Sequence, residues 1–279
     1  MPEGNTVHLA ARRLNDALAG ETIIRSDFRV PKLATLDLSG RVVRSVLARG
    51  KHIFIRLDDE TSVHTHFKMD GEWHLYRPAE RWRGPSFQVR LVLATTSWIA
   101  VGFRLPVIDV VPTASEDTVV GHLGPDILGP DWDAGIALER FVADPDRPIG
   151  EALLDQRVMA GLGNVFRCEL CYLTGVDPST PIGLLRDPAR VIALAHKLVV
   201  ANRGNPDQVT TGDPRGGRSH WVYGRGGRSC RRCKSTIHRR DGADDPSGRV
   251  TYWCPTCQPV AMGARAISVA RADGGRPGG

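Results

Sequence analysis

The chain has 279 residues, 41% of them apolar, which is long enough for two folded domains with buried cores and excludes an intrinsically disordered protein. The absence of a long apolar run excludes membrane-spanning helices, and the N-terminus lacks the pattern of a secretory signal. The net charge is +6, but residues 203–240 alone hold ten basic and two acidic residues, and such local basicity favours a phosphate-rich partner.

The first residues, Met1-Pro2-Glu3-Gly4, could carry covalent chemistry. Removal of Met1 would leave Pro2 with a secondary α-amine, which can attack an aldehyde carbon to give a cationic iminium. Glu3 could act beside it as a general acid and base. Taken alone, these residues are also typical of an ordinary first helical turn. Apolar spacing predicts that helix from Thr6 to Ala19.

Short β-rich runs between residues 21 and 111, separated by turn residues, predict an antiparallel sandwich or barrel. Examples of these runs are residues 22–24, 42–47, 52–57, 87–93 and 98–101. Within this part, Lys51 follows a turn and could reach a phosphate or donate a proton, or be one more exposed lysine. A hairpin-like stretch then places Met69 near a loop tip, where it could enter a base stack or pack inward. His64 and His66 alternate on one strand face and are interpreted as polar or phosphate contacts.

Residues 112–135 are rich in proline, glycine and acidic residues and mark the best domain boundary. Helices are predicted after it, at residues 136–143, 149–158, 164–173 and 188–202. The turn before the third helix contains Gly163 and Asn164, whose position suits a phosphate site at a helix N-terminus, although a turn without a ligand has the same pattern. Cys168 and Cys171 within that helix are interpreted as buried thiols.

Four later cysteines form two C-x-x-C pairs, Cys230 with Cys233 and Cys254 with Cys257. This spacing predicts that the four thiolates converge on one structural zinc ion. Two β-like runs between the pairs, residues 236–238 and 249–253, predict a hairpin with Arg249 at the foot of its return strand. The final residues, from Gly263 onward, lack a core pattern and are expected to be disordered.

The sequence resembles the formamidopyrimidine-DNA glycosylase and endonuclease VIII family over residues 1 to about 259. The resemblance rests on five stretches in a fixed order, namely Met1-Pro2-Glu3-Gly4, Arg49-Gly50-Lys51-His52, Met69-Asp70-Gly71, residues 154–164, and Arg249 through Gln258. The chain is most similar to the actinobacterial endonuclease VIII branch, notably at residues 210–212 and 221–225.

The resemblance implies an α+β fold of two domains: an N-terminal helix with an antiparallel β-sandwich, then a helix-two-turns-helix domain with a four-cysteine zinc finger. The expected boundaries, in chain order, are 1–115 for the catalytic helix and sandwich, 116–135 for a linker, 136–224 for the helix-two-turns-helix domain, 225–259 for the zinc finger and 260–279 for a disordered tail.

The resemblance also assigns roles to matching residues. Pro2 would attack the sugar C1′ of a flipped nucleotide as the Schiff-base nucleophile, and Glu3 would shuttle protons. Lys51 would assist base loss and β-elimination, and Arg249 would hold phosphate and support δ-elimination. The expected DNA contacts are Asn164 with Gly163 at a phosphate, Met69 in the gap left by the flipped base, and His66 and Lys68 nearby.

The implied function is that of a bifunctional DNA glycosylase and AP lyase of base excision repair, with damaged DNA as partner and one structural Zn²⁺ per chain. A monomer in the bacterial cytoplasm, associated with the nucleoid and not with a membrane, is expected. Gly102 through Pro106 lack most of the Arg and Phe wedge of guanine-lesion enzymes, which favours oxidised pyrimidines. The alternatives are a guanine-lesion glycosylase of the same family and a noncatalytic zinc-dependent DNA-binding protein.

Overall fold

The computed structural model describes residues 2–245 and 248–260, so the expected tail from residue 261 onward lies outside the described residues. Two compact units make up the described chain. Unit 1 runs to Trp132 and includes the later segment Arg203–Pro206, and unit 2 comprises Asp133–Asn202 and the residues from Asp207 onward. Among the described residues, every helix is too short or too polar to span a lipid bilayer.

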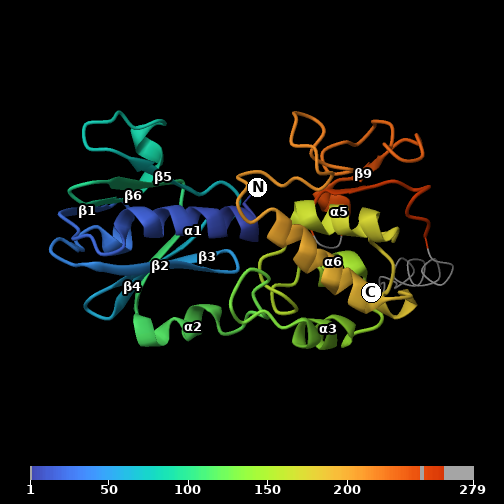
Figure 1. Cartoon of the computed structure of the whole chain (residues 1–279), viewed down its shortest axis with the longest axis horizontal. Helices are drawn as coiled ribbons and strands as arrows, with labels where there is room; N and C mark the ends of the chain where they lie inside the picture. Colours follow the sequence, from blue (N-terminus) through green and yellow to red (C-terminus); the bar gives the residue numbers. More distant parts are fainter. Residues whose placement is uncertain (1, 246–247, 261–279) are drawn as a thin grey trace, which may run out of the picture. The chain divides into compact units, whose positions relative to one another are not determined.

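Unit 1 holds one long helix and two four-stranded antiparallel sheets (Figure 1). One sheet has the strand order β1-β6-β7-β5 and the other β2-β3-β4-β8. The elements are α1 (Gly4–Leu18), β1 (Arg25–Phe28), η1 (Pro31–Leu33), β2 (Val43–Arg49), β3 (His52–Leu57), β4 (Thr61–His66), β5 (Glu72–Tyr76), η2 (Ser86–Gln88), β6 (Val89–Ala94), β7 (Ile99–Phe103), β8 (Val107–Pro112), η3 (Thr113–Ser115) and α2 (Asp117–Val120).

The main core of unit 1 joins α1 to the inner faces of both sheets. Alternate residues of β3, such as Ile53 and Ile55, point into this core together with Leu91 and Leu93 of β6, while α1 contributes residues such as Leu14. Val92, which lies between these two leucines in β6, points to a second cluster on the opposite face of the sheet. The predicted N-terminal helix and antiparallel sandwich are therefore confirmed.

Strands β5 and β8 were not among the runs named from the sequence, and β4 was predicted only through the alternation of His64 and His66. In β4 the reason is its polar sequence, because Ser62, His64 and Thr65 are all buried. The hydroxyl of Ser62 donates to Glu116 Oε1 at 2.6 Å, and that carboxylate also pairs with Arg56. Such polar partners are supplied by the folded sandwich, so a strand built on them gives no apolar alternation in the sequence.

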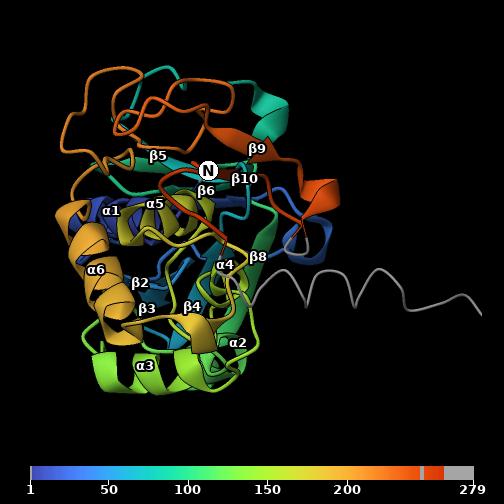
Figure 2. The ribbon, with the colours of Figure 1, turned by 90° about the vertical axis from the view of Figure 1, so that its right-hand side faces the viewer.

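Unit 2 combines helices with a small hairpin, and α6 packs against both α5 and α3 (Figures 1 and 2). Its elements are α3 (Ala134–Val142), α4 (Ile149–Ala152), α5 (Asn164–Thr174), η4 (Ile182–Leu184), α6 (Pro188–Ala201), β9 (His238–Arg240), η5 (Gly242–Asp244) and β10 (Thr251–Trp253). The helix predicted over residues 149–158 was too long, and the first hairpin strand begins two residues later than predicted.

Helix α5 is buried along most of its length and organises unit 2 through two charged side chains. Glu169 is fully buried, and its carboxylate accepts backbone N–H groups of Trp221, Val222 and Tyr223, each at 2.8 Å. The hydroxyl of Thr210 donates to the same carboxylate. Since a buried charge is tolerated only when it is hydrogen-bonded, this carboxylate fixes the loop over residues 210–223.

Glu169→Ala should lower the free energy of unfolding by about 3 kcal/mol, because it leaves three buried N–H groups without an acceptor. Chemical denaturation followed by circular dichroism measures this change. Glu139→Ala, at an exposed position on α3, is the control and should change stability by less than about 0.5 kcal/mol. Equal stability of the two variants would show that Glu169 is not the anchor of the loop.

Candidate functional site

The start of α1 places Pro2 directly before a fully buried carboxyl group. Glu3 is the N-cap of the helix and is 0% exposed, whereas Pro2 is partly exposed. The Glu3 backbone N–H donates to Oγ1 of Thr6 at 2.9 Å, which holds the first turn. Positive charge at this end of a helix is disfavoured by the helix dipole. An amine on Pro2 would therefore be biased toward its unprotonated, nucleophilic form.

A segment distant in sequence covers this first turn within unit 1. Asn5 is buried and its side-chain N–H donates to the carbonyl of Asn205 at 3.2 Å. One turn further along, Nε of Arg203 donates to the ring of His8 at 2.9 Å. Burial and the nearby Arg203 lower the pKa of His8, so its ring accepts this bond as a neutral imidazole. The start of α1 is thus fixed from outside the helix.

Lys51 occupies the two-residue turn between β2 and β3, where Arg49 pairs with His52. Gly50 has a φ of +57°, and its N–H donates to Oδ2 of Asp126 at 2.6 Å. Arg49 forms an ion pair with Asp131 beside this contact. Figure 1 shows the turn at the same end of unit 1 as the start of α1. The backbone that carries Lys51 is therefore held in place by a buried acid.

The loop after β4 lies next to the Lys51 turn, because His66 pairs with His52 in the sheet. Gly71 closes this loop: its N–H donates to the Phe67 carbonyl at 2.8 Å, and a Cβ there would lie 2.8 Å from the same oxygen. Lys68 is exposed with a φ of +48°, and Met69 is 49% exposed at the tip. The end of β4 and this loop thus carry three of the five residues predicted to contact DNA, namely His66, Lys68 and Met69.

His66 is a neutral donor in this arrangement. Burial is the main reason that its pKa falls to about 4. Its Nδ1 accepts the N–H of Lys68 at 2.9 Å, so the proton of the neutral ring lies on Nε2. A neutral imidazole N–H can donate to a phosphate oxygen without adding charge.

His64 makes polar contacts within unit 1, which is one of the two interpretations given for it from the sequence. It is 2% exposed, and its Nε2 lies 2.9 Å from Nδ1 of His52. Its Nδ1 faces Oδ2 of Asp109 at 3.5 Å, and its ring stacks on Phe54. The side chain is therefore buried on the face of its sheet opposite to Ile53 and Ile55, which is the same strand face as that of His66.

In unit 2, the glycine turn before α5 meets the hairpin that carries Arg249. Gly163 is the N-cap of α5, so Asn164 is the first helical residue rather than the cap. The Asn164 amide donates to the carbonyl of Val250 at 2.8 Å, and its Oδ1 is buried without a hydrogen-bond partner. This bond holds the helix start directly beside the exposed Arg249.

A buried arginine strengthens this junction. Arg167 is 2% exposed and donates to the same Val250 carbonyl at 3.2 Å and to the hydroxyl of Thr251. It also lies 3.7 Å from the carboxylate of Asp245, whose side chain is 7% exposed. The loop that carries Arg249 is therefore tied to α5 by charged and neutral hydrogen bonds.

The four predicted metal ligands converge in unit 2. The sulfur atoms of Cys230, Cys233, Cys254 and Cys257 all lie within 4.8 Å of one another. Four sulfur donors at this separation suit a tetrahedral, closed metal site. The cluster shares an apolar core with α5, including Cys168 and Tyr172.

Cys168 and Cys171 are fully buried on α5 and lie outside the four-cysteine cluster, as predicted. Burial raises the pKa of the Cys168 thiol to about 11, and it also raises the pKa of Cys171. Neither thiol is therefore ionised at neutral pH, which fits apolar packing.

Comparison with known proteins shows to which family this chain belongs. Residues 1–104 match the model of the formamidopyrimidine-DNA glycosylase N-terminal domain. The chain is 53% identical to "Probable endonuclease 8 2" of Streptomyces coelicolor over 261 residues, which cover 92% of this chain and 94% of the relative. The chain belongs to the formamidopyrimidine-DNA glycosylase and endonuclease VIII family.

Two further similarities agree with this membership. The chain is 47% identical to "DNA-(apurinic or apyrimidinic site) lyase Nei2" of Mycolicibacterium smegmatis, covering 92% of this chain and 99% of the relative. A crystal structure of Lactococcus lactis formamidopyrimidine-DNA glycosylase on DNA with an AP site matches with a TM-score of 0.76 at 20% identity. It covers 92% of this chain and 99% of that chain, and at this identity it shows the shared fold.

Residues 102–106 differ from the wedge sequence of the guanine-lesion branch, and the contacts of Phe103 and Arg104 show what these two side chains do instead. Phe103 is 1% exposed and packs in the second core cluster, so it cannot act as a wedge. Arg104 has a φ of +48° and pairs with Glu72, and its Nη1 donates to Gln88 at 2.6 Å. Both side chains stabilise unit 1 itself.

Three supporting residues were not predicted from the sequence: Asp126, Arg167 and Glu169. Asp126 lies in the stretch interpreted as a linker, and burial raises its pKa although two backbone N–H groups donate to it. Arg167 and Glu169 stand two apart inside an otherwise apolar helix. Charged residues at such positions are rarely buried without partners, and this signal could have identified both.

Proposed function

We propose that this chain is a bifunctional DNA glycosylase and AP lyase of base excision repair that acts through a Schiff base on Pro2. Membership in the family gives the enzyme class. Unit 1 would supply the reacting groups and some of the DNA contacts, and unit 2 would supply further phosphate contacts and the metal-stabilised finger. The observation that carries the proposal is the fully buried Glu3 carboxyl group at the start of α1, directly after Pro2.

The reaction follows from the chemistry of a secondary amine. The nitrogen of Pro2, once Met1 is removed, forms a bond to C1′ of a flipped nucleotide while the glycosidic bond breaks and the base leaves with a proton. The C1′–O4′ bond then opens as O4′ takes up a proton, which leaves a cationic iminium at C1′. The iminium makes a C2′ proton acidic, so loss of that proton expels the 3′ phosphate, and loss of a C4′ proton then expels the 5′ phosphate. Glu3 would move protons beside the sugar, and Lys51 would assist base loss and β-elimination.

Arg249 and Asn164 are proposed to act together on the DNA backbone. Because Asn164 holds the carbonyl of Val250, the guanidinium of Arg249 is presented from a fixed loop. A fixed arginine can donate two hydrogen bonds to one phosphate and favours departure of phosphate in δ-elimination. Gly163, His66 and Lys68 would add backbone contacts, with Met69 in the gap of the duplex.

Arg249→Ala should reduce cleavage of an abasic strand and reduce the slope of log affinity against log salt by about 1, because one phosphate contact is lost. Gel assays of cleavage and binding titrations at several salt concentrations measure both effects. Arg186→Ala, at an exposed position in the same unit, is the control and should change neither. A normal cleavage rate and salt slope in Arg249→Ala would remove this residue from the interface.

The four-cysteine cluster fits one structural Zn²⁺. Cys230, Cys233, Cys254 and Cys257 would fill all four positions and leave none for water, so the ion would stabilise the finger rather than take part in the reaction. Its effect is to hold the hairpin that carries Arg249.

Oxidised pyrimidines are the proposed lesions, since the strand from Gly102 to Pro106 lacks an exposed wedge set. A panel of duplexes with thymine glycol, dihydrouracil, 8-oxoguanine and an abasic site tests this. We expect excision of both pyrimidine lesions and cleavage at the abasic site. Preferred excision of 8-oxoguanine would favour the guanine-lesion alternative, and binding without any cleavage would favour a noncatalytic DNA-binding protein. We expect a monomer acting on DNA in the bacterial cytoplasm.

A further inference from the structure

Phe87 has an unusually exposed aromatic side chain. It is 76% exposed, the largest value for any large apolar side chain among the described residues. Burial of a phenylalanine stabilises a fold, and this mostly exposed side chain contributes little of that stabilisation. By contrast, Trp82 in the same β5–β6 connection packs onto the second core cluster of unit 1. The connection therefore folds against the sheet while Phe87 points away from it.

The backbone around Phe87 is held on several sides. The N–H of Arg83 donates to the Tyr76 hydroxyl at 3.0 Å, and Arg29 donates to the Ser86 carbonyl at 3.2 Å. The Gln88 carbonyl accepts the backbone N–H of Arg104 at 2.8 Å. Phe87 lies between these contacts, in the short helix η2. The backbone that carries the ring is thus held in place, so a ligand would lose little entropy in ordering this segment.

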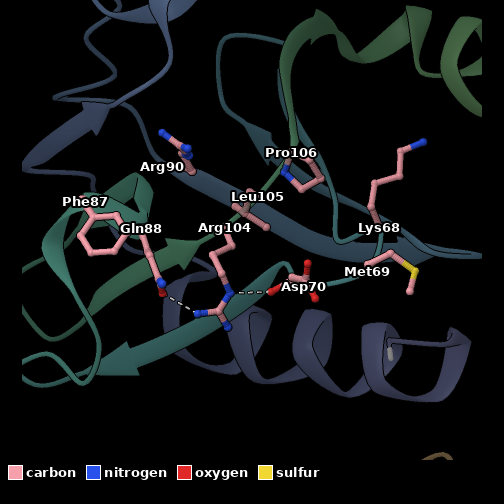
Figure 3. A pocket seen from close by; sticks show the side chains of 9 residues that line it. All are labelled: Lys68, Met69, Asp70, Phe87, Gln88, Arg90, Arg104, Leu105 and Pro106. Carbon is pink, nitrogen blue, oxygen red and sulfur yellow. Dashed lines mark hydrogen bonds between the residues drawn. The ribbon is translucent and has the colours of Figure 1, made fainter.

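A hollow of about 390 Å³ opens beside this ring, within the size range of small-ligand sites. Figure 3 shows Phe87 at one end of the hollow and Met69 at the other, with Leu105 between them. Met69 and Phe87 are two of the few exposed large apolar side chains in the described chain, and they line one cavity. Because two exposed apolar side chains line the same hollow, this surface is an apolar patch and not one isolated exposed phenylalanine.

Cations surround the same hollow. Lys68 and Arg90 line it and are exposed, and neither forms an ion pair with another described residue. Arg104 also lines the hollow, and its Nε donates to the Asp70 carbonyl at 3.1 Å (Figure 3). Its charge is balanced by an ion pair with Glu72. Asp70 is the one acidic side chain in the lining. An apolar, aromatic site with two available cations suits a planar group attached to phosphates.

We propose that this hollow is a nucleobase subsite, in which one unstacked base of bound DNA lies against the Phe87 ring while Lys68 and Arg90 approach the adjoining phosphates. The assignment rests on the proposed function only in taking DNA as the ligand. Base flipping leaves unpaired bases near a lesion, and an aromatic face can replace the stacking that such a base has lost. Phe87 would then contribute to affinity without taking part in bond cleavage.

The test is a binding titration with duplexes that contain tetrahydrofuran, an abasic analogue that cannot be cleaved through an imine. Phe87→Ala should weaken binding by about 5- to 100-fold, the range for loss of one base-stacking aromatic, with an unchanged salt slope. Phe87→Trp should restore affinity, and Phe87→Leu should not, because leucine is apolar without a flat ring. Ile24→Ala, at a 56% exposed position of unit 1, is the control and should bind like the wild type.

A second set of duplexes identifies the base. One further base at a time is removed from positions around the tetrahydrofuran on both strands, and each duplex is titrated with wild type and Phe87→Ala. At one position, the loss of the base should weaken wild-type binding and leave Phe87→Ala unaffected. The inference is overturned if Phe87→Ala binds like the wild type, if Phe87→Leu restores affinity, or if no base couples to Phe87. Failure of the proposed function would instead appear as tight binding with no cleavage of a natural abasic site.

Discussion

Glu3→Gln should lower the rates of base excision and strand cleavage by about 10²- to 10⁴-fold, the contribution of a well-placed general acid and base. The Glu3 carboxyl group is fully buried at the helix N-cap beside Pro2. An acid elsewhere on the surface would not lie next to the Pro2 nitrogen and so would not take over proton transfer there. Glutamine has nearly the same shape and keeps the polar group at the start of α1. Single-turnover assays on a duplex with dihydrouracil measure the chemical steps apart from binding.

Two controls separate this effect from a loss of structure. Asp16→Asn changes an acid on the same helix whose side chain is 66% exposed, and it should leave both rates unchanged. Affinity of Glu3→Gln for tetrahydrofuran DNA should also stay within about threefold of the wild type, because the change removes a proton donor and no phosphate contact. Full activity of Glu3→Gln would assign proton transfer to another group.

Cys254→Ala should remove the bound metal and reduce affinity for abasic DNA by at least about 100-fold. Structural zinc contributes its binding energy to folding, and the four sulfur atoms here lie in the same core cluster as α5. Loss of one ligand would release the hairpin that holds Arg249. Metal content by mass spectrometry and binding by anisotropy measure the two effects.

Cys171→Ala is the matched control for this prediction. Cys171 is also fully buried in unit 2, but it lies outside the four-cysteine cluster. Its replacement should cost stability of the order of 1 kcal/mol and retain one metal ion per chain with near-normal binding. If Cys254→Ala kept its metal and its affinity, the finger would not support the DNA contact.

The sequence predicted those parts of the molecule that depend on local pattern. Helix α1, strand β3 and the two cysteine pairs follow apolar periodicity or fixed ligand spacing, and each appears where it was predicted or within a few residues. The order of the motifs predicted the family, and the family predicted the fold.

Features that depend on distant partners could not be predicted in this way. His64 is buried only because β3 and β8 place His52 and Asp109 beside it. Arg167 and Glu169 are stable in an apolar helix only because loops 41 or more residues away supply their partners, in the case of Glu169 from residues 210–223. The sequence distance between such partners is unrelated to the repeat of a helix or a strand, so periodicity cannot predict that they meet.

The central claim is that the nitrogen of Pro2 becomes bonded to C1′ of the damaged nucleotide. Borohydride reduction during reaction with abasic-site DNA, followed by protease digestion and mass spectrometry of the cross-linked peptide, tests this directly. The expected product is a stable adduct on the peptide that begins with Pro2, with Met1 absent. A preparation that cleaves abasic DNA while its Met1 is retained, or an adduct on Lys51 or another lysine, would contradict the account.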